Sequence, residues 1–405
     1  MKHLVLLCDN YPNSDGEFFL DDEINIISDN FENITIICSS SKNASTRPIP
    51  INVTVVNVTQ FSILQKLISI IRSLFFLPLW KDFFNLPNYK LKPSITYLKL
   101  LVSDYVKSSI LLKNIKINKL INGNNFVYYA YWHDYKALTI ARLKEKTNCV
   151  AVARCHRWDL YFYANKLEYL PFKKYILKNL TYTASISLDG IKYMLDTHGY
   201  EFKDKLMLSR LGKLNNRLPN YEKKNNEFLI CSCSHFNNFK RVHLIPRVLK
   251  NITKPKIKWI HFGWGYAEYE KMVHDELEGV EFDFELMGLV DNQKILDFYR
   301  DNYVDIFIST SSSEGVPVSM MEALSSGIPV CATNVGGVSE IVNCESGFLI
   351  PKDFDIQEVA KELESYLLMP AYFQTQKRKA AREQWDLNYD ANKNYNDFSN
   401  ILINA

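Results

Sequence analysis

The sequence has 405 residues, of which 47% are hydrophobic and 23% are charged, a composition typical of a soluble globular protein of two or three domains. The formal net charge of +3 excludes recognition of nucleic acid through overall charge. The eight cysteines are scattered, without a Cys-x-x-Cys pair or a Cys/His cluster at zinc spacing. We therefore expect the cysteines to be reduced.

The first seven residues are mostly apolar and are followed at once by Asp9 and Pro12. Such a run is too short for the core of a signal peptide and predicts a first buried strand. We therefore expect a cytoplasmic protein, either free or peripheral on the inner face of the cell membrane.

Short apolar runs then alternate with longer amphipathic segments, a pattern that predicts parallel sheets covered by helices. In the first half, the sequence predicts strands at residues 4–8, 34–38, 53–58, 126–131, 150–154 and 183–186. In the second half, it predicts strands at residues 228–232, 258–262, 282–287, 305–308, 329–332 and 347–350. A polar stretch at residues 215–226, rich in Asn and Lys, predicts a linker between the halves. The chain is therefore predicted to be an α/β protein of two Rossmann-like domains with a cleft between them.

Residues 61–120 interrupt this alternation, because they carry ten Lys and Arg residues but only two acids. Lys66, Arg72 and Pro78 break up the apolar beginning of the segment and argue against a membrane-spanning helix. Two interpretations stay open. The segment forms helices packed on the first sheet with solvated lysines, or it forms a basic, amphipathic surface that contacts an anionic membrane.

A polar and aromatic cluster follows the predicted strand at 150–154 and extends to Tyr161. Parallel sheets place ligand-binding groups at the carboxyl ends of their strands. His156 is therefore a candidate donor to a phosphate or a sugar hydroxyl. The alternative is a structural histidine held by Asp159.

Residues 228–245 predict a strand, a polar turn and a basic helix start. Lys240 and Arg241 lie at this first strand-to-helix turn of the second half, where two cations can neutralise a diphosphate. The alternative is a pair of solvated surface cations.

Residues 305–322 read as a buried strand, a serine-rich turn and a helix that opens near Pro317. The free N–H groups of the first helical turn would point at an anion such as a diphosphate. Glu314 precedes that turn and Glu322 lies one to two turns inside the helix, so one carboxylate could hold sugar hydroxyls and the other a ribose diol. Two solvated glutamates at a helix start are the alternative.

Two further patterns carry less weight. Gly263 and Gly265 form a Gly-x-Gly after a strand, but Glu268 stands where a dinucleotide fingerprint needs a third glycine, so we expect only a tight turn. Asp353 and Asp355 match an Asp-x-Asp metal pattern, yet aspartate is common there as a helix cap. We therefore predict no metal site.

Together, these motifs resemble the retaining glycosyltransferases of family 4, which have the GT-B fold of two Rossmann-like domains facing across a cleft. The resemblance is densest from Asp305 to Pro351, covers most of 205–370, and reaches the first half in patches at 9–24 and 150–161.

The resemblance implies two domains of different roles. We expect an acceptor-binding domain at residues 1–208 and a nucleotide-sugar-binding domain at residues 209–387. A C-terminal helix at about residues 388–405 is expected to pack back on the first domain.

The resemblance also assigns roles to individual residues. Glu314 would contact the donor sugar, Lys240 would stabilise the leaving diphosphate, and His156 would reach the sugar or the phosphate. The other donor-binding residues implied are Gly16, Arg154, Asp159, His235, Arg241, Met287, Gly288, Gly315, Val316, Pro317, Val318 and Glu322.

The sequence departs from the family at two positions. His235 stands where the family has an arginine five residues before the lysine, and Arg241 is the candidate to compensate. The first loop has a lone Gly16 before Glu17, where the family has a pair of glycines.

The implied function is transfer of a sugar, with retention of configuration, from a nucleotide donor to a glycan or lipid-linked glycan. A UDP-linked donor is the first expectation, in capsule, O-antigen or exopolysaccharide assembly. No cofactor or metal is expected, because Lys240 and helix N-termini supply the positive potential at the diphosphate. Two alternatives stay open: a sugar-nucleotide epimerase of the same architecture, and a non-catalytic nucleotide- or glycan-binding protein on a decayed transferase scaffold.

Overall fold

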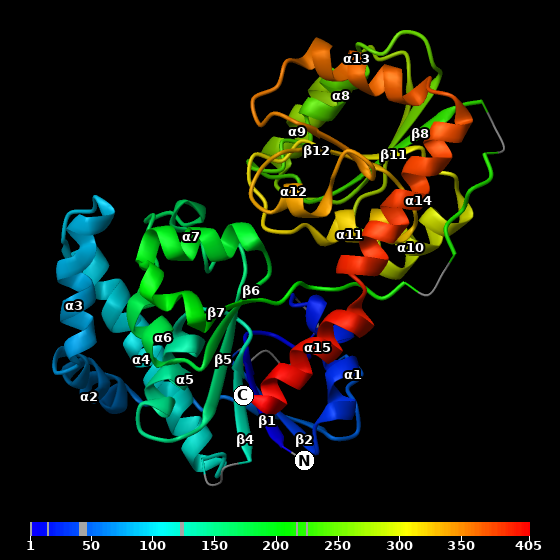
Figure 1. The fold of residues 1–405 in the computed structure, drawn as a ribbon. Helices are drawn as coiled ribbons and strands as arrows, with labels where there is room; N and C mark the ends of the chain where they lie inside the picture. The colour runs from blue at the N-terminus through cyan, green and yellow to red at the C-terminus, as the bar shows by residue number, and fades with distance from the viewer. Residues whose placement is uncertain (1, 14–15, 40–46, 122–124, 216–217, 224–225) are drawn as a thin grey trace. The chain divides into compact units, whose positions relative to one another are not determined.

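The computed structural model describes residues 2–13, 16–39, 47–121, 125–215, 218–223 and 226–405. The chain forms two compact units (Figure 1). Unit 1 comprises Met1–Leu211 together with Ala391–Ala405, and unit 2 comprises Gly212–Asp390.

Unit 1 is built on a parallel sheet in the order β3-β2-β1-β4-β5-β6-β7. Its strands are β1 (His3–Cys8), β2 (Asn33–Cys38), β3 (Val53–Asn57), β4 (Phe126–Ala130), β5 (Val150–Cys155), β6 (Tyr182–Ser185) and β7 (Leu206–Leu208). The first six coincide with predicted strands. The sequence missed β7, because three residues at a sheet edge are too few to show a periodic pattern.

Helices cover both faces of this sheet (Figure 1). They are α1 (Phe19–Ile27), α2 (Ile63–Leu74), α3 (Leu77–Asn85), α4 (Ile95–Ile117), α5 (Tyr135–Lys144), α6 (Lys173–Asn179), α7 (Leu188–His198) and α15 (Ala391–Asn404). Short 3₁₀ segments are η1 (Ser28–Asn30), η2 (Leu86–Tyr89), η3 (Phe162–Ala164) and η4 (Tyr200–Lys205). The predicted basic segment 61–120 thus forms α2, α3 and α4, and α4 packs on α2, α3 and α5.

Unit 2 repeats the plan with a parallel sheet in the order β10-β9-β8-β11-β12-β13. Its strands are β8 (Phe228–Cys233), β9 (Ile257–Phe262), β10 (Asp283–Leu286), β11 (Ile306–Ser309), β12 (Val330–Thr333) and β13 (Gly347–Ile350), all six of them predicted. Its helices are α8 (Leu244–Leu249), α9 (Ala267–Leu277), α10 (Asn292–Asp301), α11 (Val318–Ser325), α12 (Val338–Ile341), α13 (Ile356–Leu367) and α14 (Ala371–Asn388).

The strand order of unit 2 reverses between β8 and β11, which pair in parallel with Ile306 opposite Ile230. Connections that leave the sheet in opposite directions at such a point leave a crevice at the carboxyl ends of the two strands. The loops that follow β8 and β11 therefore emerge together at one edge of the sheet, and this edge holds the motifs with Lys240 and Glu314.

The C-terminal helix α15 belongs to unit 1, where it packs against α1. Its Phe398 ring lies 5.1 Å from the ring of Tyr129 on β4 and 4.3 Å from the guanidinium of Arg154 on β5. The end of the chain therefore completes the hydrophobic cover of the first sheet.

The predicted linker at 215–226 falls partly outside the described residues, at 216–217 and 224–225. Its described parts are anchored on unit 2. Asn215 donates to Ser325 Oγ at 2.8 Å, and Lys223 pairs with Asp305 at 2.7 Å. These contacts make the stretch part of the second unit, whose boundary lies at Gly212.

Candidate functional site

An ion pair joins the loops that follow β8 and β11 in unit 2. The Nζ atom of Lys240 lies 2.6 Å from Glu314 Oε1, although the two residues are 74 positions apart in the sequence. The Glu314 side chain is buried and that of Lys240 is one-fifth exposed. The turn is held by Asn237, whose Oδ1 accepts from the backbone N–H of Lys240 at 2.9 Å. A buried carboxylate thus meets a cation at the switch point of the sheet.

Backbone donors follow directly after Glu314. Helix α11 begins at Val318, and Pro317 is its N-cap in an extended conformation (φ −71°, ψ 125°). The helix therefore begins one residue later than the sequence predicted, and Pro317 is its cap instead of its first helical residue. Within the described residues, the N–H groups of Gly315, Val316 and Val318 have no hydrogen-bond acceptor. Open N–H groups at a helix N-terminus form an anion-binding site.

The loop that follows β12 packs against the backbone of Glu314 and Gly315. The N–H of Gly337 donates to the carbonyl of Gly315 at 3.0 Å. Gly336 has φ +53°, and a Cβ atom at that position would lie 2.1 Å from the carbonyl oxygen of Glu314. Gly336 therefore lets the chain after β12 pack against the backbone that carries Glu314.

Glu322 lies in the second turn of α11 and is buried. Its Oε1 accepts a hydrogen bond from Asn292 Nδ2 at 2.6 Å. Asn292 is the first residue of α10, and the sequence offered no signal for it because a polar residue at a helix start is ordinary. The carboxylate is thus oriented by a side chain from another helix.

Arg241 uses its guanidinium to tie loops together. Its Nε donates to the carbonyl of Thr310 at 2.8 Å, and its Nη2 donates to the carbonyl of Lys352 at 2.7 Å. Thr310 Oγ1 in turn donates to the carbonyl of Arg241 at 2.9 Å. These contacts favour a structural role. The predicted contact of Arg241 with a diphosphate stays a prediction.

The Gly-x-Gly turn is explained by close packing of the chain. Cβ atoms at Gly263 and Gly265 would lie 1.9 Å from the carbonyl oxygen of Ser234 and 2.2 Å from that of Phe236. The loop that contains His235 is thereby joined to the next strand end, where His235 Nδ1 lies 3.1 Å from the Trp264 carbonyl oxygen.

The segment predicted to face the nucleotide base follows β10. The N–H of Met287 donates to the carbonyl of His261, and the carbonyl of Gly288 accepts from the N–H of Gly263, both at 2.9 Å. The Met287 side chain is exposed. Gly288 has φ +64° with open space where a side chain would stand.

In unit 1, His156 is a buried histidine without a hydrogen-bond partner for either ring nitrogen among the described residues. Its ring lies 4.8 Å from that of Tyr131 and 4.5 Å from that of Trp132. The nearest carboxylate oxygen, of Asp159, is 4.0 Å from Nδ1. Buried polar atoms nearly always find a partner, so two open nitrogens favour a ligand contact over the structural alternative.

Asp159 and Arg154 are buried and make polar contacts in the interior of unit 1. Asp159 accepts from the backbone N–H groups of His156 at 2.5 Å and His133 at 2.6 Å. Arg154 pairs with the buried Glu23 at 2.8 Å. Burial raises the pKa of the Glu23 carboxyl, and the Arg154 guanidinium opposes that rise. These residues position the strand end that carries His156.

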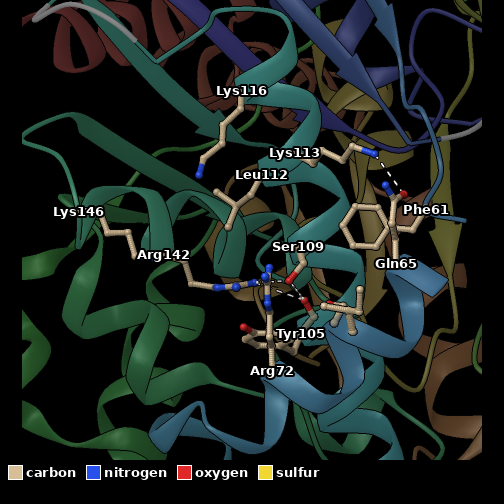
Figure 2. A pocket seen from close by; sticks show the side chains of 12 residues that line it. Phe61, Gln65, Arg72, Tyr105, Ser109, Leu112, Lys113, Lys116, Arg142 and Lys146 are labelled. Carbon is tan, nitrogen blue, oxygen red and sulfur yellow. Dashed lines mark hydrogen bonds between the residues drawn. The ribbon is translucent and has the colours of Figure 1, made fainter.

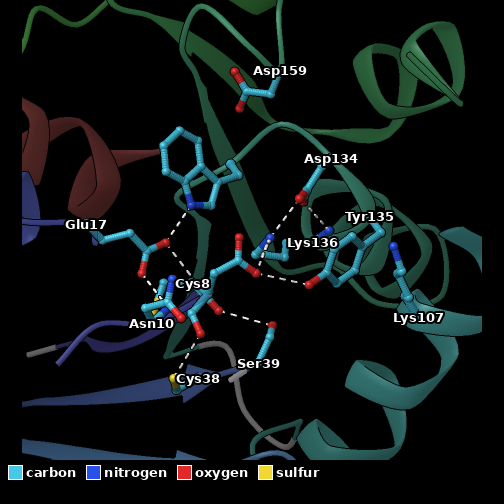
Figure 3. Close-up of polar contacts among 12 residues, drawn as sticks. Cys8, Asn10, Glu17, Cys38, Ser39, Lys107, Asp134, Tyr135, Lys136 and Asp159 are labelled. Atoms are coloured by element: carbon cyan, nitrogen blue, oxygen red, sulfur yellow. Dashed lines mark hydrogen bonds and ion pairs between the residues drawn. The ribbon is translucent and has the colours of Figure 1, made fainter. Parts of the chain in front are cut away.

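The loop after β1 contains a polar network that the sequence did not reveal (Figure 3). The carboxylate of Glu17 accepts from the N–H groups of Asp9 at 2.9 Å, Asn10 at 2.6 Å and Tyr11 at 2.8 Å. Gly16, with φ +84°, provides the backbone turn that places Glu17 there. Three converging backbone donors are a typical anion-binding arrangement, occupied here by the chain's own carboxylate.

Beside this loop, Lys136 is fully buried between two carboxylates (Figure 3). Its Nζ lies 2.9 Å from Asp9 and 2.7 Å from Asp134. The two carboxylates raise the pKa of Lys136 and outweigh the opposing effect of burial. The loops after β1 and β4 are thereby held together.

No group of three His, Cys, Asp or Glu side chains within the described part of the chain is placed to hold a metal ion. In the Asp-x-Asp sequence, Asp355 is the N-cap of α13 and accepts from the N–H groups of Gln357 and Glu358. Asp353 is exposed, 3.8 Å from Arg241. Asp355 is thus a helix cap, as the sequence analysis expected. That the protein needs no metal stays a prediction.

Comparison with known proteins finds a family model that matches part of the chain. Residues 216–384 match the family model described as glycosyl transferases group 1. The O-antigen biosynthesis glycosyltransferase WbnH of Escherichia coli is 25% identical over 240 residues, which cover 55% of this chain and 65% of WbnH. The chain spans between about a third and two thirds of the length of the curated relatives it matches.

Solved structures resemble the whole chain. Anabaena Alr3699/HepE in complex with UDP and glucose has a TM-score of 0.67 at 14% identity, and the match covers 100% of both chains. The lipopolysaccharide outer core galactosyltransferase WaaB in its apo form has a TM-score of 0.69 at 14% identity, covering 98% of this chain and 99% of WaaB. The predicted fold class is confirmed: two Rossmann-like domains, each with a parallel sheet, as in GT-B glycosyltransferases.

Proposed function

We propose that this chain is a retaining glycosyltransferase of cell-surface polysaccharide synthesis. It would transfer a sugar from a nucleotide donor, in the first instance UDP-linked, to a glycan or lipid-linked glycan. The match to group 1 glycosyl transferases supports the enzyme class. The names of WbnH and WaaB support the kind of product, and the HepE complex with UDP and glucose supports the kind of donor.

One observation carries the proposal: Lys240 and Glu314 meet beside open backbone donors at the start of α11. In the proposed complex, the donor diphosphate accepts hydrogen bonds from the N–H groups of Gly315, Val316 and Val318 and faces the Lys240 ammonium. Glu314 turns from Lys240 to the hydroxyls of the sugar. Glu322, oriented by Asn292, accepts from the ribose hydroxyls.

The proposed reaction is a substitution on the face from which the diphosphate leaves. The acceptor oxygen forms its bond to the anomeric carbon as the bond to the diphosphate oxygen breaks, and the departing phosphate takes the proton of the acceptor hydroxyl. Lys240 and the backbone donors stabilise the negative charge that develops on the leaving diphosphate, so the proposal requires no metal. His156 is proposed to donate to the sugar or the phosphate, which its two open ring nitrogens support.

The first test is binding of the donor. Thermal unfolding would be followed with UDP, GDP, CDP and UDP-sugars, with and without EDTA. A nucleotide present at about a hundredfold above its Kd should stabilise the protein by about 2.7 kcal/mol. Stabilisation by one nucleotide family, unchanged by EDTA, is expected. No shift with any nucleotide would contradict the proposed donor site, and loss of the shift with EDTA would contradict metal independence.

The second test is turnover in matched variants. Lys240→Gln removes a cation that stabilises the leaving diphosphate, and Glu314→Gln removes the charge of the carboxylate that holds the sugar. Each is expected to lower kcat by about 100- to 1000-fold. Lys258→Gln and Glu285→Gln remove a surface ion pair on neighbouring strands of the same unit and serve as controls. Equal activity in the two sets would contradict the assigned roles.

The anomeric configuration of the product, read by NMR, tests retention. Consumption of the donor to an isomeric sugar nucleotide without an acceptor would instead identify an epimerase. Nucleotide binding without turnover on any acceptor would identify a binding protein.

A further inference from the structure

Helix α2 is packed with its polar residues inward. It begins with a full capping box, in which the Ser62 hydroxyl accepts from the N–H of Gln65 and the Gln65 side chain accepts from the N–H of Ser62. Its buried residues are Ser69 and Ser73. Its large apolar residues are exposed, among them Ile63 at 80%. An amphipathic helix packed on a soluble core has the opposite arrangement.

The exposed apolar surface continues beyond α2. Phe75, between the two helices, is 81% exposed. The indole Nε1 of Trp80 on α3 donates to the carbonyl of Leu74 at 2.8 Å and ties α3 to the end of α2. We call the following residues the α2–α3 apolar surface: Ile63, Leu64, Leu67, Ile68, Ile71, Leu74, Phe75, Leu77 and Phe84, all exposed. An apolar set of this size on successive helices marks an interaction surface.

Directly beside α2 lies a basic pocket of about 540 Å³, between α2, α4 and α5 (Figure 2). Five cationic side chains line it: Arg72, Lys113, Lys116, Arg142 and Lys146. No carboxylate lines the pocket, and no ion pair joins any of the five to the part of the chain that the structure describes.

Arg142 is held in the pocket by neutral groups. Its Nη1 donates to Ser108 Oγ at 2.8 Å and to Ser109 Oγ at 3.1 Å, and its guanidinium lies 4.0 Å from the centre of the Tyr105 ring. Arg72 points toward the same space from α2 (Figure 2). Cations that converge without a carboxylate repel one another until an anion joins them.

Neither acid of residues 61–120 offsets the positive charge, and Glu145, whose charge acts on Arg142, accepts a hydrogen bond from the Tyr175 hydroxyl at 2.8 Å. Asp82 is buried and accepts hydrogen bonds from the Tyr169 hydroxyl at 2.5 Å and the Phe172 N–H at 2.6 Å. Asp104 is also buried, 3.8 Å from Lys107. The partner of this face must therefore be anionic as well as apolar. A second copy of the chain would present the same positive face and is disfavoured.

We propose that the α2–α3 apolar surface and the basic pocket together dock unit 1 on an anionic lipid bilayer. The apolar side chains enter the boundary between headgroups and acyl chains, and the five cations bind the phosphate of an anionic headgroup. Among the described residues no single helix is long and apolar enough to cross a membrane. The bent pair Ile63–Leu74 and Leu77–Tyr89, at 65°, passes that test by length and composition only. Lys66, Arg72 and Lys81 within the pair favour a position along the surface.

The proposal does not depend on the sugar chemistry, because its test measures membrane binding alone. The full-length protein would be sedimented with vesicles of phosphatidylcholine, and with vesicles of phosphatidylcholine and phosphatidylglycerol in equal parts. Binding is expected only to the anionic vesicles. Binding to neither kind, or equally to both, would overturn the proposal.

Two sets of substitutions separate the components. Arg72→Gln with Lys116→Gln and Lys146→Gln neutralises three exposed pocket cations. Since each cation near an anionic surface contributes about fivefold in affinity, this set is expected to weaken binding by roughly a hundredfold. The matched control neutralises three exposed lysines elsewhere in unit 1 and should bind within a few-fold of the unaltered protein: Lys178→Gln, Lys192→Gln and Lys203→Gln.

The second set, Leu64→Ser with Ile71→Ser and Phe75→Ser, tests insertion of the apolar side chains. All three residues are exposed, so the fold should survive, which circular dichroism would verify. Loss of at least tenfold in binding is expected. Unchanged binding would overturn insertion, and equal losses in the pocket and control sets would overturn the assigned phosphate site.

Discussion

Substituting Gly336 by Ala tests how the site of unit 2 is supported. The backbone at Gly336 has φ +53°, and the new Cβ would lie 2.1 Å from the carbonyl oxygen of Glu314. Real Cβ atoms do not approach an oxygen so closely, and the atom in the way belongs to the backbone. The Gly336 loop or the Glu314 loop must therefore shift.

The expected magnitude has two parts. A left-handed conformation costs an alanine about 1–2 kcal/mol relative to glycine. Forcing an extra methyl group into a packed site costs about 1–3 kcal/mol more. Gly336→Ala should therefore lower the free energy of unfolding by about 2–5 kcal/mol. Gly279→Ala is the matched control in unit 2, because Gly279 has φ +69° and nothing within 4 Å of its Cβ position, so only the first part applies.

The assay is urea unfolding of both variants, followed by tryptophan fluorescence, together with nucleotide binding of the folded proteins. The free energy of unfolding of Gly336→Ala should be lower than that of Gly279→Ala by the cost of packing the extra methyl group, about 1–3 kcal/mol. Gly336→Ala should also bind nucleotide more weakly, because Glu314 and Gly315 have moved. Equal losses of stability in the two variants would refute the argument that Gly336 is required for close approach. Unimpaired nucleotide binding in Gly336→Ala would separate this loop from the proposed donor site.

Three further predictions concern buried side chains that can carry a charge: His261, Arg154 and Glu17. Burial lowers the pKa of His261 from 6.5 to about 4. Below about pH 6.5 the unfolded chain therefore takes up a proton that the folded chain does not. The free energy of unfolding should fall by about 3 kcal/mol as the pH drops toward 4. Urea unfolding across this range should show a weaker pH dependence in His261→Gln and an unchanged one in the exposed control His274→Gln. Replacing Arg154 by Met leaves the Glu23 carboxyl buried without its cation and should cost about 3–5 kcal/mol at neutral pH. Burial raises the pKa of Glu23, so thermal unfolding should show a smaller loss as the pH is lowered and the carboxyl takes up a proton. A loss independent of pH would argue against this pair. Glu17→Gln weakens charge-assisted hydrogen bonds to three backbone N–H groups and should cost about 1.5–3 kcal/mol in urea unfolding, whereas an unchanged stability would contradict the anion-binding role of that loop.

The sequence by itself determined every described strand except β7, together with the order of the motifs. Apolar runs such as Ile306–Ser309 and Val330–Thr333 are local patterns, and every strand of unit 2 could be read from them. The segment around Glu314 and Pro317 could be predicted for the same reason, since strand, turn and helix start are neighbours in the chain. The start of α11 was displaced by one residue, because a proline suits both the cap and the first helical position.

Only the tertiary structure decided which side chains meet. The pairing of Lys240 with Glu314 depends on the order of β8 and β11 in the sheet, which no local pattern encodes. The same holds for Arg241, whose donors are used by distant carbonyl groups, and for Asn292, which orients a carboxylate on another helix.

The direction in which a helix presents its faces is also a tertiary property. The composition of residues 61–120 allowed either a buried or a membrane-facing α2, because hydrophobic periodicity shows that a helix has two faces but not which one is covered. Helix α2 packs on α4 with Ser69 and Ser73 buried, and this packing decided that its leucines and isoleucines face outward. Local sequence sets what each segment can form, whereas contacts between distant segments determine which of its surfaces are left for function.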